Sequence, residues 1–129
     1  MLNLSHKNLE VYKISLMLLK EIYILTNKFP KEEQYNLVSQ LRRAAVSVCS
    51  NIAEGAARIS AKEKKRFYEI ARASLVEVDT QFEISLLLEY LTRENIIAFE
   101  KFEESVFRML SKMINNLNDS SHLPKTTSH

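Results

Sequence analysis

Basic residues gather in the middle of this sequence, and their chemistry is that of phosphate binding. Residues 42–72 carry eight Lys or Arg against three Glu, a net charge of +5, whereas the whole chain carries only +2. Ammonium and guanidinium groups bind phosphate oxygens through charge and hydrogen bonding, and they contact the backbone of a polyanion rather than its bases. The candidate phosphate contacts are Arg42, Arg43, Arg58, Lys62, Lys64, Lys65, Arg66 and Arg72.

Two other interpretations account for the same charges. Solvated protein surfaces carry mixed charge, and pairs at i,i+4 spacing such as Lys65–Glu69 and Glu54–Arg58 would neutralise part of it. Residues 73–119 hold four basic residues against nine acidic ones, a net charge of −5. An acidic face of one subunit could therefore meet the basic face of the next. No aromatic side chain is placed to stack bases as in an RNA-recognition sheet.

Residues suited to catalysis are sparse. The three histidines stand near the chain ends, at His6, His122 and His129. The single cysteine, Cys49, is far from all of them in sequence, so no general base is expected beside its thiol. The chain lacks the Glu-x-x-His pairs of di-metal bundles, and one glycine, Gly55, cannot build a phosphate-cradling loop. We therefore expect a non-enzymatic protein with no catalytic residues, no metal and no cofactor.

Four helical segments must position the basic residues. One glycine and two prolines supply too few turns for a sheet protein, whereas apolar residues, 46% of the chain, recur in steps of three and four. The predicted helices span residues 8–28, 31–58, 61–90 and 93–118, followed by a flexible polar tail over 119–129. Short links force neighbouring helices to run antiparallel. The expected fold is an all-α, antiparallel, up-down-up-down four-helix bundle forming one domain over residues 1–129.

Apolar stripes and capping residues define these segments. The predicted core stripes are Val38, Leu41, Ala45, Val48 and Ile52 in the second segment, Phe67, Ile70, Ala71, Ser74, Val78, Phe82 and Ser85 in the third, and Ile96, Phe99, Val106, Leu110, Met113 and Leu117 in the fourth. Ser60 and Glu63 form a capping box that starts the third helix. Thr92 is the predicted N-cap of the fourth helix.

The first segment is more apolar than a lone bundle requires. Its charged residues gather in one arc of roughly 100°, and apolar residues fill most of the remaining circumference. We expect this surplus to contact a second subunit, since large exposed apolar patches mark contact surfaces. The alternative is that the loop and tail of the same chain cover it. The candidate interface residues are Leu9, Tyr12, Leu16, Ile22 and Tyr23.

Cysteine usage and apolar run length bear on the compartment. A single cysteine cannot form an intrachain disulfide, which favours a reducing, cytoplasmic setting. The longest unbroken apolar runs are about four residues, whereas a membrane span needs roughly 20. We therefore expect a cytoplasmic protein with no membrane partner.

One long run of the sequence carries a family resemblance. The matching residues are Leu9–Lys13, Ile22–Tyr23, Phe29–Glu33, Gln40–Val48, Ser50–Gly55, Arg58, Lys62–Glu63, Phe67–Leu75, Glu77, Gln81, Leu88 and Tyr90. Together they resemble the four-helix bundle proteins encoded in intervening sequences of bacterial 23S ribosomal RNA genes. The resemblance extends over residues 5–115.

This resemblance implies a four-helix fold and a ring-like homopentamer, as in the similar accessory proteins of diversity-generating retroelements. Those relatives engage nucleic acid and a reverse transcriptase with a basic surface. By resemblance, we expect a homo-oligomer that binds RNA or DNA through its basic stretch. The alternative is a protein-interaction scaffold that docks a partner polypeptide, with no direct nucleic-acid role.

Overall fold

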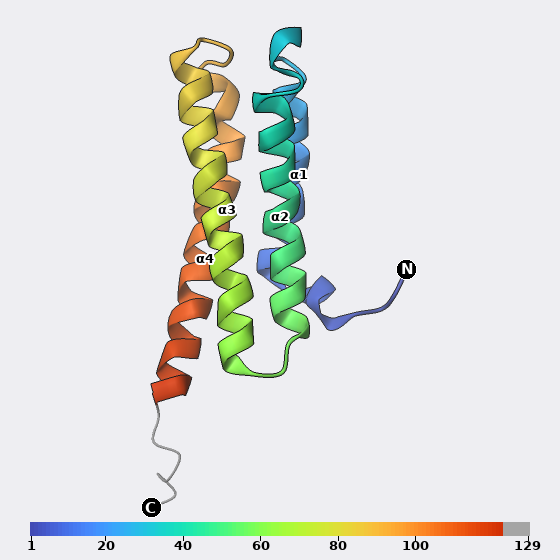
Figure 1. Ribbon diagram of the computed structural model, residues 1–129, viewed down its shortest axis with the longest axis vertical. Coiled ribbons are helices and arrows are strands. Elements are labelled where there is room, and N and C mark those ends of the chain that lie inside the picture. Colours follow the sequence, from blue (N-terminus) through green and yellow to red (C-terminus); the bar gives the residue numbers. More distant parts are fainter. Residues whose placement is uncertain (123–129) are drawn as a thin grey trace, which may run out of the picture.

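Four long α-helices build the protein, as expected from the apolar periodicity (Figure 1). The computed structural model describes residues 1–122. The α-helices are α1 (Glu10–Thr26), α2 (Leu37–Ala57), α3 (Ala61–Leu87) and α4 (Ile97–His122), and the short 3-10 helices are η1 (Ser5–Asn8), η2 (Lys31–Glu33) and η3 (Glu94–Ile96). None of the helices within these residues combines the length and apolar character needed to cross a membrane.

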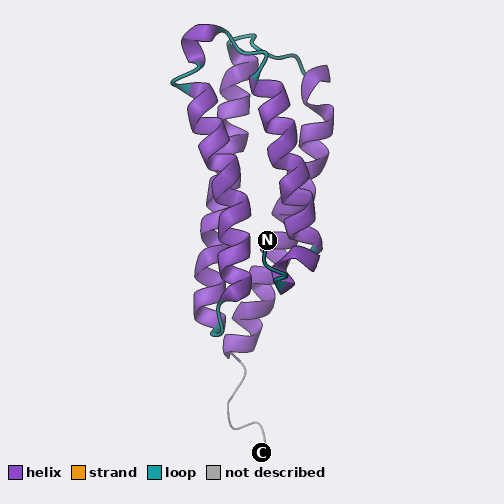
Figure 2. Ribbon diagram, turned by 90° about the vertical axis from the view of Figure 1, so that its right-hand side faces the viewer, coloured by secondary structure: helices purple, strands orange, loops and turns teal. Residues whose placement is uncertain are grey.

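The helices run up-down-up-down, which confirms the predicted fold class. The α2–α3 turn lies at one end of the bundle, together with the start of α1 and the lower part of α4 (Figure 1). The α1–α2 and α3–α4 connections lie together at the opposite end (Figure 2). Each helix packs on its two neighbours, α1 on α2 and α4, and α3 on α2 and α4.

The predicted stripes form most of the core. All five stripe residues of α2 are buried, and so are Phe99, Val106 and Leu110 of α4. Phe82 meets Phe99 with ring centroids 4.3 Å apart, which joins α3 to α4. One stripe residue, Ile70, is exposed, because the buried side of α3 is centred on Ala71, Leu75 and Val78. Four further predicted stripe positions are only half-buried: Phe67, Ser74, Met113 and Leu117.

The predicted start of the second helix is wrong by six residues. After Pro30 the chain makes the 3-10 turn η2, and α2 begins only at Leu37. The Glu33 carboxylate accepts hydrogen bonds from the Tyr90 hydroxyl at 2.7 Å and from the Asn36 amide at 3.0 Å. The bond from Tyr90 lowers the pKa of Glu33 and raises the pKa of Tyr90. This contact joins the α1–α2 connection to the α3–α4 connection.

The other boundary differences have local causes. The first helix ends at Thr26 and the third at Leu87, two and three residues before the predicted ends. The fourth helix is preceded by η3, whose start is held by a hydrogen bond from the Asn95 amide to the Thr92 hydroxyl. Residues 119–122, predicted as the start of a flexible tail, belong to α4. Residues 123–129 of that predicted tail lie outside the described residues.

A Schellman motif without glycine ends α3. The Tyr90 amide donates to the Ser85 carbonyl at 2.9 Å, and the Glu89 amide donates to the Leu86 carbonyl at 3.0 Å. This pattern requires a left-handed residue after the C-cap, and Glu89 occupies it with φ of 62°. A side chain in that conformation costs about 1 kcal/mol, whereas glycine adopts it freely.

Glu89→Gly should therefore stabilise the protein. We expect the free energy of unfolding to rise by up to about 0.5 kcal/mol, after the greater entropy of glycine in the unfolded chain is subtracted. The same change to glycine at exposed Glu83, inside α3, should lower the free energy of unfolding by about 1 kcal/mol. Urea unfolding at equal protein concentration measures both. A loss of stability in both variants would contradict the strain at Glu89.

Candidate nucleic-acid interface

The basic residues of the α2–α3 turn are presented by a link of three residues. Helix α2 ends at Ala57, and Arg58, Ile59 and Ser60 span the gap to α3. The backbone is extended at Arg58 and at Ser60. The Ser60 hydroxyl accepts from the Glu63 amide at 3.1 Å, as expected for one half of the predicted capping box. The link thus fixes the first turn of α3 beside the last turn of α2.

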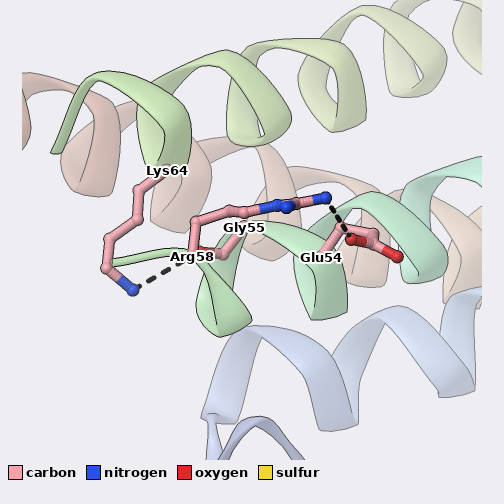
Figure 3. Close-up of polar contacts among 4 residues, drawn as sticks. All are labelled: Glu54, Gly55, Arg58 and Lys64. Atoms are coloured by element: carbon pink, nitrogen blue, oxygen red, sulfur yellow. Dashed lines mark hydrogen bonds and ion pairs between the residues drawn. The ribbon is translucent and has the colours of Figure 1, made fainter. Parts of the chain in front are cut away.

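Lys64 holds this turn together instead of facing a ligand. Its ammonium group donates to the Gly55 carbonyl at 3.4 Å (Figure 3). It also donates to the Ala56 carbonyl at 3.1 Å, at the C-terminal end of α2. A cation at this position satisfies free carbonyls and opposes the negative end of the helix dipole. The helices also approach closely, since a Cβ on Gly55 would lie 2.6 Å from Cε1 of buried Tyr68.

Arg58 forms the ion pair expected from its spacing to Glu54. Their nitrogen and oxygen atoms are 3.0 Å apart, and both side chains are exposed (Figure 3). The Arg58 guanidinium also lies 4.7 Å from the centroid of the Phe67 ring, and the Arg66 guanidinium lies 5.8 Å from the same centroid. Two guanidinium groups therefore lie near the ring of Phe67. An exposed ion pair is worth about 0–1 kcal/mol, so an incoming phosphate can compete for Arg58.

The remaining charges of this turn are not neutralised by ion pairs. Within the described residues, the Arg58–Glu54 contact is the one ion pair within 4.0 Å. The predicted Lys65–Glu69 pair does not form. Lys62 and Arg66 are exposed, and Lys65 is half-buried. We call Arg58, Lys62, Lys65 and Arg66 the basic end of the bundle.

Three predicted phosphate contacts lie away from the basic end. Arg42 lies near the C-terminus of α1 and donates to Asn27 Oδ1 at 2.9 Å, Thr26 Oγ1 at 3.0 Å and the Tyr23 carbonyl at 3.4 Å. Its guanidinium also covers the Tyr23 ring at 4.5 Å. This side chain therefore caps α1, because a free helix C-terminus attracts a cation.

The other two are Arg43 and Arg72. Arg43 follows Arg42 on α2, is exposed and has a hydrogen bond to Ser39 Oγ at 3.4 Å. Arg72 donates to Ser111 Oγ at 3.2 Å and lies 6.0 Å from the Phe107 centroid, so it links α3 to α4. Neither joins the cluster at the α2–α3 turn.

Two residues of the turn were not among the sequence candidates. Ile59 is 98% exposed between Arg58 and Ser60. Phe67 receives Arg58 from across the turn, a contact that depends on how the helices pack. In the sequence, the only sign that Phe67 belongs to this cluster is its basic neighbour Arg66.

The predicted interface residues of α1 divide into exposed and buried sets. Leu16 and Tyr23 are exposed, and Leu9 and Tyr12 are half-buried against the core. Ile22 was a wrong choice, since it is 0% exposed and lies in the core. Met17 and Ile24 are exposed instead. Within residues 1–122, an apolar surface of α1 therefore stays uncovered.

Cys49 lies inside the bundle. Cys49 is buried, its thiol donates to the Ser15 carbonyl at 3.3 Å, and burial raises the pKa of the thiol. The part of the chain that the structure describes brings no three His, Cys, Asp or Glu side chains together in a way that could hold a metal ion.

The different roles of Arg42 and Arg43 predict different effects of truncation. Arg42→Ala should lower the free energy of unfolding by about 1–2 kcal/mol, because the C-terminus of α1 loses its cation and hydrogen bonds. The neighbouring change Arg43→Ala should stay within about 0.5 kcal/mol. Thermal unfolding of both variants measures the difference. Equal effects would contradict the capping role of Arg42.

A comparison with solved structures supports the fold. The crystal structure of a protein with unknown function from the S23 ribosomal protein family of Bacteroides thetaiotaomicron matches with a TM-score of 0.74 and 23% sequence identity. The match covers 81% of this chain and 95% of that chain. A comparison with curated proteins gives no match.

The comparison with protein families agrees with the resemblance carried by Gln40–Val48 and Ser50–Gly55. The family model described as 23S rRNA-intervening sequence protein matches residues 7–112. That match includes all of α1, α2 and α3 and most of α4, together with the basic end. The chain belongs to the 23S rRNA-intervening sequence protein family.

Proposed function

We propose that this protein is a non-catalytic, homo-oligomeric nucleic-acid-binding protein that holds the phosphate backbone of RNA or DNA with its basic end. The observation that carries the proposal is the cluster of Arg58, Lys62, Lys65 and Arg66 at one end of the bundle, where only Arg58 has an ion-pair partner among the described residues. Unpaired cations attract phosphates and release the counterions condensed around them.

The rigid surroundings of the cluster support phosphate binding. Lys64 satisfies the carbonyls at the end of α2, and Ser60 caps α3, so the link between these helices is held at both sides. Neighbouring cations can then meet phosphates without first ordering the turn, which lowers the entropic cost of binding. Contacts of this kind position a nucleic acid and carry no base sequence.

Assembly would multiply the effect of each basic end. The exposed apolar residues of α1, including Leu16 and Met17, support association between copies. The family resemblance gives five as the expected subunit number. Several basic ends on one particle would raise the effective concentration of cations along a polyanion. The single cysteine, Cys49, is buried and free of a disulfide, which supports a cytoplasmic setting.

The family name suggests the first RNA to test. It refers to intervening sequences of 23S rRNA, so a transcript of such a sequence is a suitable probe beside an unrelated RNA and a DNA of equal length. Similar affinity for all three would agree with backbone recognition.

Charge reversal at the basic end should weaken RNA binding. In Lys62→Glu/Lys65→Glu/Arg66→Glu, we expect the affinity at about 0.1 M salt to fall by at least tenfold. The slope of log affinity against log salt should drop by about 2–3, because each lost phosphate contact removes about 0.7–0.9. Fluorescence anisotropy across a salt series measures both quantities.

The matched control is Lys28→Glu/Lys31→Glu/Arg93→Glu. These three residues are exposed, lie at the opposite end of the bundle, and give the same change in net charge. The control should retain most of the affinity. Equal losses of affinity in the two triple variants would mean that net charge, not the basic end, governs binding. Unchanged affinity in the basic-end variant would refute the site.

Pull-down from lysate with and without nuclease tests the alternative protein-scaffold function. If the protein binds nucleic acid, nuclease treatment should release most co-purifying material. Recovery of one protein that resists nuclease and is retained by the basic-end variant would favour a scaffold that docks a polypeptide.

A further inference from the structure

A groove of about 310 Å³ lies between α3 and α4, on a surface separate from the basic end. It is lined by Leu75, Val76, Asp79, Glu103, Glu104 and Phe107. Val76 and Phe107 are exposed, although both are apolar. The groove therefore combines apolar walls, which are exposed to water, with three carboxylic acids.

The acidic side of the groove has no basic residue in its lining. Oxygen Oε2 of Glu103 is buried and has no hydrogen-bond partner among the described residues. Burial, a hydrogen bond with the Asp79 side chain, and the charges of Asp79 and Glu100 raise the pKa of Glu103 to about 8. The nearby cation on α3, Arg72, bonds to Ser111 instead. Because its lining holds three acidic residues and no basic one, the groove is suited to a cation from outside.

Helix α1 carries a surface of complementary chemistry. The residues Lys13, Leu16, Met17, Lys20 and Ile24, here called the outer face of α1, are all exposed. At 100° per residue they fall within an arc of about 100°. Neither lysine forms an ion pair within the described residues. The outer face thus places ammonium groups among apolar side chains, whereas the groove places carboxylic acids among apolar side chains.

The groove and the outer face of α1 do not cover each other within one chain. Both are exposed in the single subunit, as the accessibility of Met17, Val76 and Phe107 indicates. Their contact requires two copies. Since the two surfaces differ, the contact would be heterologous, and such contacts generate closed rings or open filaments.

We infer that the outer face of α1 of one copy docks in the α3–α4 groove of the next copy, where Lys20 contacts exposed Asp79 beside Glu103. This inference rests on the homo-oligomer of the proposed function and identifies the surfaces that form it. Met17 and Ile24 then pack against Val76 and Phe107, so that apolar area leaves water on both sides. The ammonium group of Lys20 then lies among the carboxylic acids of the groove and offsets their like charges.

Charge reversal with rescue tests this contact. Lys20→Glu and Asp79→Lys should each place like charges in the interface and weaken association at least tenfold, whereas Lys20→Glu/Asp79→Lys should restore it. Exposed Lys101→Glu and Glu83→Lys, outside the groove and the outer face, are matched controls that should assemble normally. Light scattering during size-exclusion chromatography reports the mass of each full-length variant, and circular dichroism confirms folding.

The pH dependence of assembly supplies a second test, which needs no charge reversal. In the free subunit, Glu103 keeps its proton below a pKa of about 8. The charge of Lys20 favours the ionised form of Glu103, so docking releases a proton. Association should therefore tighten as the pH rises from about 6.5 to 9, a range in which lysine stays charged because it lies below the usual lysine pKa. Glu103→Gln should remove this dependence while the protein still folds.

The outcomes separate this inference from the proposed function. If the parent assembles and Lys20→Glu or Asp79→Lys assembles equally well, the docking contact is wrong, while the homo-oligomer and its nucleic-acid binding stand. A parent protein that stays monomeric at high concentration would overturn the contact and the oligomer together. If the reversed variants do not fold, Glu103→Gln decides. The contact would be overturned if the association of this variant depended on pH in the same way as that of the parent.

Discussion

Close packing of α2 against α3 across a three-residue link determines where the charges of this protein lie. Gly55 lets the ring of Tyr68 approach the α2 backbone, and Lys64 satisfies the carbonyls that α2 leaves free at its end. A longer or looser turn would spread the basic residues around it. The tight turn instead gathers Arg58 and the first basic residues of α3 at one end of the bundle.

The antiparallel fold gives the molecule surfaces of distinct chemistry. Cations stand at the α2–α3 turn, and the carboxylic acids of the α3–α4 groove lie farther along the bundle beside exposed Val76 and Phe107. A molecule with two such surfaces can bind a polyanion at one of them and another subunit at the other, without competition between the two ligands. Assembly and nucleic-acid binding would then reinforce each other, because each added copy brings another basic end.

Periodicity predicted the helices and most of the core, because buried positions such as Val48 and Phe82 follow the 3.6-residue repeat. It failed where tertiary contacts decide. The end of α3 lacks a glycine signal, since Glu89 takes the left-handed position. Ile22 seemed suited to an interface because a sequence cannot distinguish core-facing from outward-facing apolar residues. Arg42 seemed free because its partners on α1 are brought near only by folding.

Photo-crosslinking of the full chain to RNA, followed by mass spectrometry of the linked peptides, tests the central claim most directly. The account predicts that linked residues concentrate in residues 58–67, around Lys62 and Phe67, and that high salt abolishes them. Links concentrated instead at the α1–α2 and α3–α4 connections would place the nucleic acid at the wrong end of the bundle and contradict the account.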